Sequence, residues 1–134
     1  MNLSNHDAAT VSEEDRNLLE TVYSRFNARD IDGVFAHMHA DVDWPNGMEG
    51  GRVHGLDEVR AYWTRQWSFV NPIVEPTAFR RADDGRILID VHQVVKDLAG
   101  YELINQRIEH LYTLEGGRIR RMDLGRVYPS ELNA

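Results

Sequence analysis

The sequence has 134 residues, of which 42% are hydrophobic, with no cysteine and a formal net charge of -7 at pH 7. This length suits one domain with its own core, and the lack of cysteine excludes disulfides, thiol catalysis and cysteine-bound zinc. The negative charge disfavours nucleic acid as a partner, and no apolar run reaches the roughly 18 residues of a membrane span, so we expect a cytoplasmic protein.

The chain should begin with a flexible arm and continue as one domain. Residues 1–11 are polar and predict the arm, and residues 12–134 predict the domain. Ser12 is a predicted N-cap, because three acidic residues follow it in the first turn of a helix that should extend to about Ala28.

A second, shorter helix should follow directly. Asp30 can cap it, and its apolar positions continue to Met38. His37 and His39 suggest metal ligands, but residues two apart do not share a helical face. We therefore expect no metal site and no cofactor.

The middle of the chain alternates short strands with a third helix. Residues 41–46 and 52–54 are expected to be strands, and a helix should start near Gly55, with Trp63 on its buried face. Four strands separated by glycine-containing turns should follow, at residues 73–81, 86–96, 102–114 and 118–127. Helices followed by antiparallel hairpins predict an α+β fold, with a curved sheet around the helices.

The strand at residues 102–114 organises the rest of the chain, because it is long enough to require a strongly twisted sheet. Its odd-numbered face carries Asn105, Arg107 and Glu109 between leucines, as expected of an apolar pocket with a few polar groups. Its even-numbered face is richer in isoleucine, tyrosine and leucine, and could equally be the core. The residue pattern alone slightly favours the second alternative.

Several short motifs lie after the first helix, before the first strand, in the third helix and near the end of the chain: Arg29 to Asp32; Met38, Ala40 and Asp41; Val53 to Gly55, Val59 and Ala61 to Trp63; Gly117 to Ile119 and Met122. With these motifs and this order of elements, the chain resembles the nuclear transport factor 2-like superfamily, and in particular its SnoaL-like polyketide cyclase and ketosteroid isomerase branch.

The resemblance implies a cystatin-like cone, with three N-terminal helices packed in a strongly curved, mostly antiparallel sheet. The open end of such a cone admits a small hydrophobic molecule, and two copies usually form a homodimer through the outer face of the sheet. It also implies that the odd-numbered face of residues 102–114 lines the cone. Ile104, Ile108 and Tyr112 would then pack outward against the second subunit.

Ketosteroid isomerases use an aspartate base, a tyrosine and a protonated acid, a worked case of pKa tuning. The resemblance places the base at Asn46, the tyrosine at Val22 and the second acid at Glu109. Asparagine cannot take a proton at neutral pH, and Tyr23 is one residue out of register on another side of its helix. Classical ketosteroid isomerase chemistry is therefore not expected.

Glu109 is then the leading candidate acid or base, with Asn46, Asn105 and Arg107 orienting a carbonyl substrate. The alternative is a structural ion pair between Glu109 and Arg107. His92 is a second catalytic candidate only if its face of residues 86–96 lines the cone, and the pattern favours the other face.

The remaining candidates are substrate-binding residues: Trp44, Trp63 and Met122 as apolar walls, and Arg126, in register with Met122, for an anionic group. The sequence thus predicts a pocket protein that acts by proton transfer on a small hydrophobic carbonyl compound, as an isomerase, cyclase or dehydratase. The alternative is a non-catalytic ligand-binding or dimerisation module.

Overall fold

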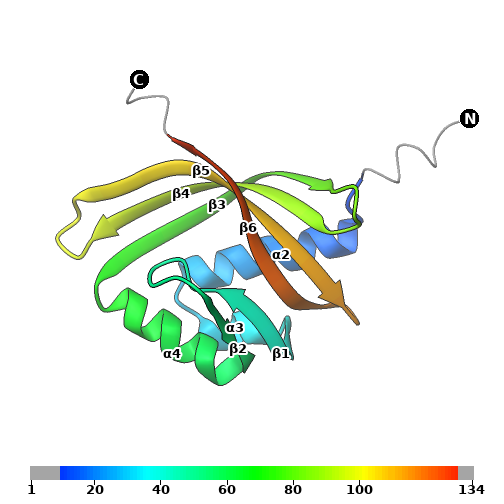
Figure 1. Cartoon of the computed structure of the whole chain (residues 1–134), viewed down its shortest axis with the longest axis horizontal. Helices are drawn as coiled ribbons and strands as arrows, with labels where there is room; N and C mark the ends of the chain where they lie inside the picture. The colour runs from blue at the N-terminus through cyan, green and yellow to red at the C-terminus, as the bar shows by residue number, and fades with distance from the viewer. Residues whose placement is uncertain (1–9, 130–134) are drawn as a thin grey trace, which may run out of the picture.

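The computed structural model describes residues 10–129 of the chain (Figure 1). It confirms the α+β class, with a six-stranded curved sheet and helices on its concave side. The elements are α2 (Glu13–Asn27), α3 (Ile31–Phe35), β1 (Met38–Pro45), β2 (Arg52–His54), α4 (Gly55–Trp67), β3 (Val70–Arg81), β4 (Ile87–Asp97), β5 (Glu102–Glu115) and β6 (Arg118–Pro129).

Two of the helices are long, and α3 has only five residues. The expectation that this second helix continues to Met38 is wrong, because Met38 opens β1 and the Ile119 N–H donates to the carbonyl of His37. Of the predicted arm, residues 1–9 lie outside the described part of the chain, whereas Val11 is buried in the core.

The strand order is β2-β1-β6-β5-β4-β3. Only the β1–β6 pair is parallel, so the sheet is mostly antiparallel, as expected. Register shifts interrupt several of these pairs, including β5–β6 and β3–β4, and such bulges bend a sheet and increase its twist. The long strands therefore wrap around α2 and α4 rather than forming a flat layer (Figure 1).

Helix α2 closes the open edge of the sheet. The Asn27 side chain donates to the Val74 carbonyl at 2.7 Å and accepts from the Val74 N–H at 3.0 Å. Because β3 is the last strand of the sheet, these bonds satisfy backbone groups that would otherwise lack a strand partner.

Arg29 fixes the end of the same helix. Its φ of 63° places it in the left-handed region, where glycine usually ends a helix. The strain of this conformation is offset by contacts that glycine could not make. The Arg29 guanidinium lies 4.9 Å from the centre of the Trp67 ring and donates to the Pro72 carbonyl at 2.8 Å. Arg29 thereby joins the ends of α2 and α4 to the start of β3.

A bulge in β6 decides which side chains of this strand face inward. Ile108 pairs with Val127, but His110 pairs with Leu124, so β6 has one extra residue between these two pairs. The bulged N–H of Arg126 donates to the Glu109 carboxylate at 3.0 Å. Met122 and Leu124 point inward before the bulge and Val127 after it, which turns Arg126 to the outer face.

None of the helices within residues 10–129 is long and apolar enough to cross a membrane. The cytoplasmic location remains a prediction from the sequence.

We predict that Gly125→Ala destabilises the fold. A Cβ at this position would lie 2.7 Å from Oε1 and 2.9 Å from Cβ of Glu109, and the second atom cannot move without the β5 backbone. The expected loss in the free energy of unfolding is about 1 to 3 kcal/mol, measured by urea denaturation. Gly47→Ala is the matched control, because the nearest atom there is 3.9 Å away, and it should change stability by about 1 kcal/mol or less. Equal stability of the two variants would contradict the role given to Gly125.

Candidate functional site

A cavity of about 540 Å³ lies between the helices and the concave face of the sheet. Side chains of α2, α4 and the inward faces of β1, β3, β4, β5 and β6 line it, and most of them are apolar. None of the lining residues is Asp, Glu, Lys or Arg. The site is therefore an uncharged pocket of the size that takes a small organic molecule.

The three predicted apolar walls do line this cavity. Trp44 comes from β1, Trp63 from α4 and Met122 from β6, and all three are nearly fully buried. The rings of Trp44 and Trp63 meet edge to face with their centres 5.5 Å apart, so each tryptophan helps to fix the other. Their part in ligand binding remains a prediction.

Three buried polar side chains meet in the wall of the cavity. The hydroxyl of Tyr23 on α2 lies 2.7 Å from Nδ1 of His110 on β5, and the Tyr112 hydroxyl donates to the Tyr23 hydroxyl at 2.9 Å. The Tyr23 and His110 rings are stacked, with their planes 13° apart. All three residues line the cavity, so a bound molecule would contact this hydrogen-bonded cluster.

Burial sets the protonation states of the cluster. It lowers the pKa of His110 to about 4, so the imidazole is neutral at pH 7. Burial also raises the pKa of Tyr112, and burial followed by the nearby Tyr112 raises the pKa of Tyr23 well above its ordinary value. Both phenols therefore keep their protons and can donate hydrogen bonds.

The hydrogen bonds of the cluster leave one ring nitrogen of His110 available. When Tyr112 donates to Tyr23, the Tyr23 hydrogen goes to Nδ1, and the neutral imidazole carries its hydrogen on Nε2. Within residues 10–129 no hydrogen bond occupies Nε2, and the Trp67 indole nitrogen is the only fully buried side-chain polar atom without a partner. Nε2 is thus left for a ligand.

The expectation that the odd-numbered face of β5 lines the cone is wrong. Ile104, Ile108 and Tyr112 line the cavity, whereas Arg107 and Glu109 line a hollow of about 390 Å³ on the opposite face of the sheet. The physical reason is burial: the even-numbered side chains provide the large apolar surfaces that the helices cover. Arg126 lies in the outer hollow too, because of the bulge.

The other predicted polar residues also lie away from the cavity. His92 is opposite Arg107 in the β4–β5 register, and its Nε2 lies 2.8 Å from the Asn105 side-chain oxygen. Asn46 does not line the cavity; it shapes the turn after β1, where its side chain bonds to the N–H and carboxylate of Glu49. Neither Glu109 nor His92 lines the cavity, and their catalytic roles remain predictions.

A SnoaL-like domain model matches residues 19–122. The chain belongs to the SnoaL-like domain family. No curated protein matches the sequence. Among solved structures, an NTF2-like protein of unknown function from Burkholderia pseudomallei is 26% identical over 85% of this chain and 91% of its own, with a TM-score of 0.73.

Two further structures share the fold of this SnoaL-like chain. TerC, co-crystallised with polyporic acid, is 23% identical, with a TM-score of 0.73 and coverage of 90% of this chain and 95% of its own. A candidate polyketide cyclase from Pseudomonas putida is 18% identical, with a TM-score of 0.69 and coverage of 81% and 88%. At these sequence identities the structural similarity shows a shared fold, and the function of this chain has to be inferred from its own site.

Sequence reasoning missed the polar cluster of the SnoaL-like pocket. Tyr23 was assigned to another side of its helix than Val22, yet both line the cavity, because a wide pocket is reached by neighbouring positions of one helix. His110 and Tyr112 share the even-numbered face of β5 with apolar residues. The sequence did contain one signal for this cluster, because His110 lies between Ile108 and Tyr112 on a mostly apolar strand face.

Within residues 10–129, no three or more His, Asp or Glu side chains are arranged as metal ligands.

We predict that stability falls with acid between pH 6.5 and 4 because of His110. The unfolded imidazole has a pKa of 6.5 and the folded one about 4, so the unfolded chain binds more protons in this interval. The contribution of the neutral His110 to the free energy of unfolding is complete above pH 6.5. About 3 kcal/mol of it is lost as the pH falls to 4. Urea denaturation at several pH values measures it.

The matched variants are His110→Gln, which should flatten this part of the pH dependence, and Tyr112→Phe, which keeps the buried imidazole and should retain it. An unchanged pH slope in His110→Gln would contradict a depressed pKa for this histidine.

Proposed function

We propose that this SnoaL-like protein binds a small, largely apolar carbonyl compound in the cavity and promotes proton transfer to and from it, as a cyclase or isomerase does. One observation carries the proposal: an uncharged apolar cavity contains the buried cluster His110–Tyr23–Tyr112, with hydrogen-bond donors and a titratable nitrogen. An apolar pocket with a few convergent polar groups is the common form of a small-molecule site.

The lining selects a neutral ligand. A charged group inside the cavity would lose its hydration without finding an opposite charge among the lining residues. A carbonyl oxygen, in contrast, can accept a hydrogen bond from a phenol of the cluster. The same bond strengthens when negative charge develops on that oxygen, which is how such donors accelerate enolate formation.

His110 supplies the base. Among the lining residues it is the one that takes a proton near or below neutral pH. If the hydrogen bonds of the cluster reverse, Nδ1–H donates to Tyr23 and Nε2 presents a lone pair. A carbon–hydrogen bond next to the carbonyl then breaks, an Nε2–H bond forms, and the electron pair moves to the carbonyl oxygen as an enolate.

The pKa of His110 restricts the substrate. A base with a pKa of about 4 is weak, so it is matched to a carbon acid that is itself acidic, such as the methylene between two carbonyl groups. The proton can return to another carbon, which is isomerisation, or to the alkoxide formed when the enolate attacks a second carbonyl, which is cyclisation.

A non-catalytic ligand-binding role is the alternative, and it is favoured because no carboxylate of the described residues lines the cavity. In that case the cluster would hold the ligand through hydrogen bonds alone. A measured acceleration of a reaction distinguishes the catalytic function from ligand binding alone.

We expect the protein to accelerate the keto–enol interconversion of benzoylacetone, a 1,3-diketone. His110→Gln should lower this acceleration by about 10²-fold because the base is lost. Tyr112→Phe should also lower it, because with the hydrogen bonds reversed Tyr23 donates to Tyr112 and the Tyr112 hydroxyl is the donor left for the enolate oxygen. The enol absorbance gives the rate, and quenching of the cavity tryptophans Trp44 and Trp63 gives the affinity.

Glu109→Gln is the control, because its side chain is on the outer face and an amide oxygen can still accept from Arg126. It should retain both binding and rate. A pH-independent rate above roughly pH 5 is also expected, since the base is already unprotonated there. Binding without acceleration would establish the non-catalytic function, and a rate lost in Glu109→Gln but kept in His110→Gln would overturn the assignment.

The homodimer also remains a proposal. The outer hollow carries both charge signs, with Arg80, Arg107 and Arg126 beside Asp90 and Glu109. A two-fold contact brings the same patch of both copies together, so mixed charges can pair across it. Light scattering should then give a dimer mass for the wild type and a lower mass for Arg107→Glu; a monomeric wild type would contradict it.

A further inference from the structure

Two glutamines in the cavity have no role in the proton transfer described above. Gln93 on β4 and Gln106 on β5 are directly opposite in the strand register, and both line the cavity. The Gln106 side-chain N–H donates to the Gln93 side-chain oxygen at 2.7 Å. We call these two side chains the amide pair.

The amide pair lies between the mouth and the buried end of the cavity. Along the inward face of β5, exposure falls from 40% at Ile104, through the half-buried Gln106, to 6% at Ile108 and 7% at His110. Gln106 and His110 are four residues apart in one strand, which corresponds to about 13 Å. The apolar side chain of Ile108 separates them.

The amide pair has unused hydrogen-bonding capacity. One N–H of Gln106 and the oxygen of Gln93 bind each other, which leaves the other N–H groups and the Gln106 oxygen for a third partner. Both glutamines are half-buried, so a ligand that covers them must replace the hydrogen bonds that these groups can make to solvent. No charged side chain of residues 10–129 lines the cavity, so a neutral group that both donates and accepts fits best, and a hydroxyl has this property.

We infer that the substrate is an elongated neutral molecule with two oxygen functions, a carbonyl at the His110–Tyr23–Tyr112 cluster and a hydroxyl at the amide pair, joined by an apolar unit. The inference rests on the proposed function and specifies its substrate class. Gln93 and Gln106 are then specificity-determining residues, which select the hydroxylated molecule over its deoxy analogue.

Two matched probes test this, 4-acetyl-4′-hydroxybiphenyl and 4-acetylbiphenyl, which differ only in the hydroxyl group opposite the ketone. Quenching of tryptophan fluorescence gives the affinity of each. The wild type should bind the hydroxylated probe about fivefold more tightly or better, the effect of one hydrogen bond. In Gln106→Leu and Gln93→Leu this preference should disappear, while the deoxy probe binds at least as tightly as before.

Gln66→Leu is the matched control, because Gln66 also lines the cavity but extends from α4 and donates to the Tyr62 hydroxyl. It should keep the preference for the hydroxylated probe. Loss of the preference in Gln66→Leu alone, or equal affinities of the two probes for the wild type, would overturn the inference.

The experiment also separates this inference from the proposed function. Benzoylacetone has no hydroxyl beyond its enol, so its binding and interconversion do not need the amide pair. Failure of both biphenyls to bind, with benzoylacetone still accelerated, overturns the substrate class alone. Failure of all three compounds overturns both proposals.

Discussion

The hydrogen bond from the Arg126 N–H to the Glu109 carboxylate decides which side chains of the last strand meet the cavity. A bulge leaves a backbone N–H without a strand partner, and Glu109 supplies that partner from the neighbouring strand. The bulge places Val127 inside and Arg126 outside. The cavity can therefore be free of charge although β6 contains several arginines.

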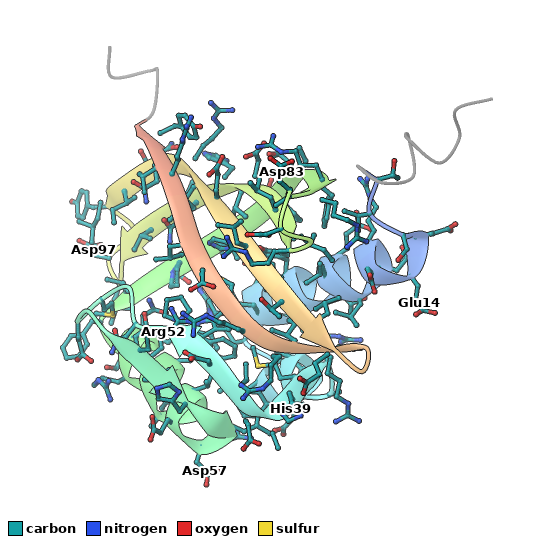
Figure 2. All side chains as sticks on the ribbon, turned by 45° about the vertical axis from the view of Figure 1, so that its right-hand side comes forward. Glu14, His39, Arg52, Asp57, Asp83 and Asp97 are labelled. Carbon is teal, nitrogen blue, oxygen red and sulfur yellow. The ribbon has the colours of Figure 1, made fainter. Side chains whose placement is uncertain are left out.

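A group of charged side chains lies on the outer face of the sheet, on β1, β2 and β6. Asp43 accepts from both Arg52 and Arg121, and these two arginines also bond to Asp123. Burial alone would raise the pKa of Asp43, but the neighbouring Arg52 and Arg121 together outweigh it and lower the pKa, so the carboxylate stays ionised. Arg52 lies where β2, β1 and β6 come together (Figure 2). Ion pairs thus stabilise the outer side of the sheet, while hydrophobic contacts enclose the cavity.

The separation of charge from the cavity explains the chemistry that we propose. In a low-dielectric pocket a neutral imidazole and two phenols are stable, whereas a carboxylate would need a counter-ion. The protein consequently offers hydrogen-bond donors and a neutral imidazole base in place of the carboxylate base of a ketosteroid isomerase. Such a site is suited to molecules that are already acidic at carbon.

The sequence by itself determined the class and order of the elements and the family. Ser12 does cap α2, accepting from the Asp15 N–H, and the helix at Gly55–Trp67 and the four long strands lie close to their predicted residues. These features follow from local rules, namely side-chain period, capping and turn residues. The apolar walls Trp44, Trp63 and Met122 could be predicted for the same reason, since large apolar residues of successive elements converge inside a curved sheet.

The identity of the polar site was decided only by the tertiary structure. The two faces of β5 differ by one residue in register, and the choice between them depends on which face the helices cover. The resemblance implied the odd-numbered face and with it Glu109 and Arg107, whereas the side-chain pattern had slightly favoured the even-numbered face that the helices do cover. Tyr23 on α2 is 87 residues away from His110 and 89 residues away from Tyr112, which both lie on β5. Such long-range proximity, like the bulge that turns Arg126 outward, arises from packing and has no local signature.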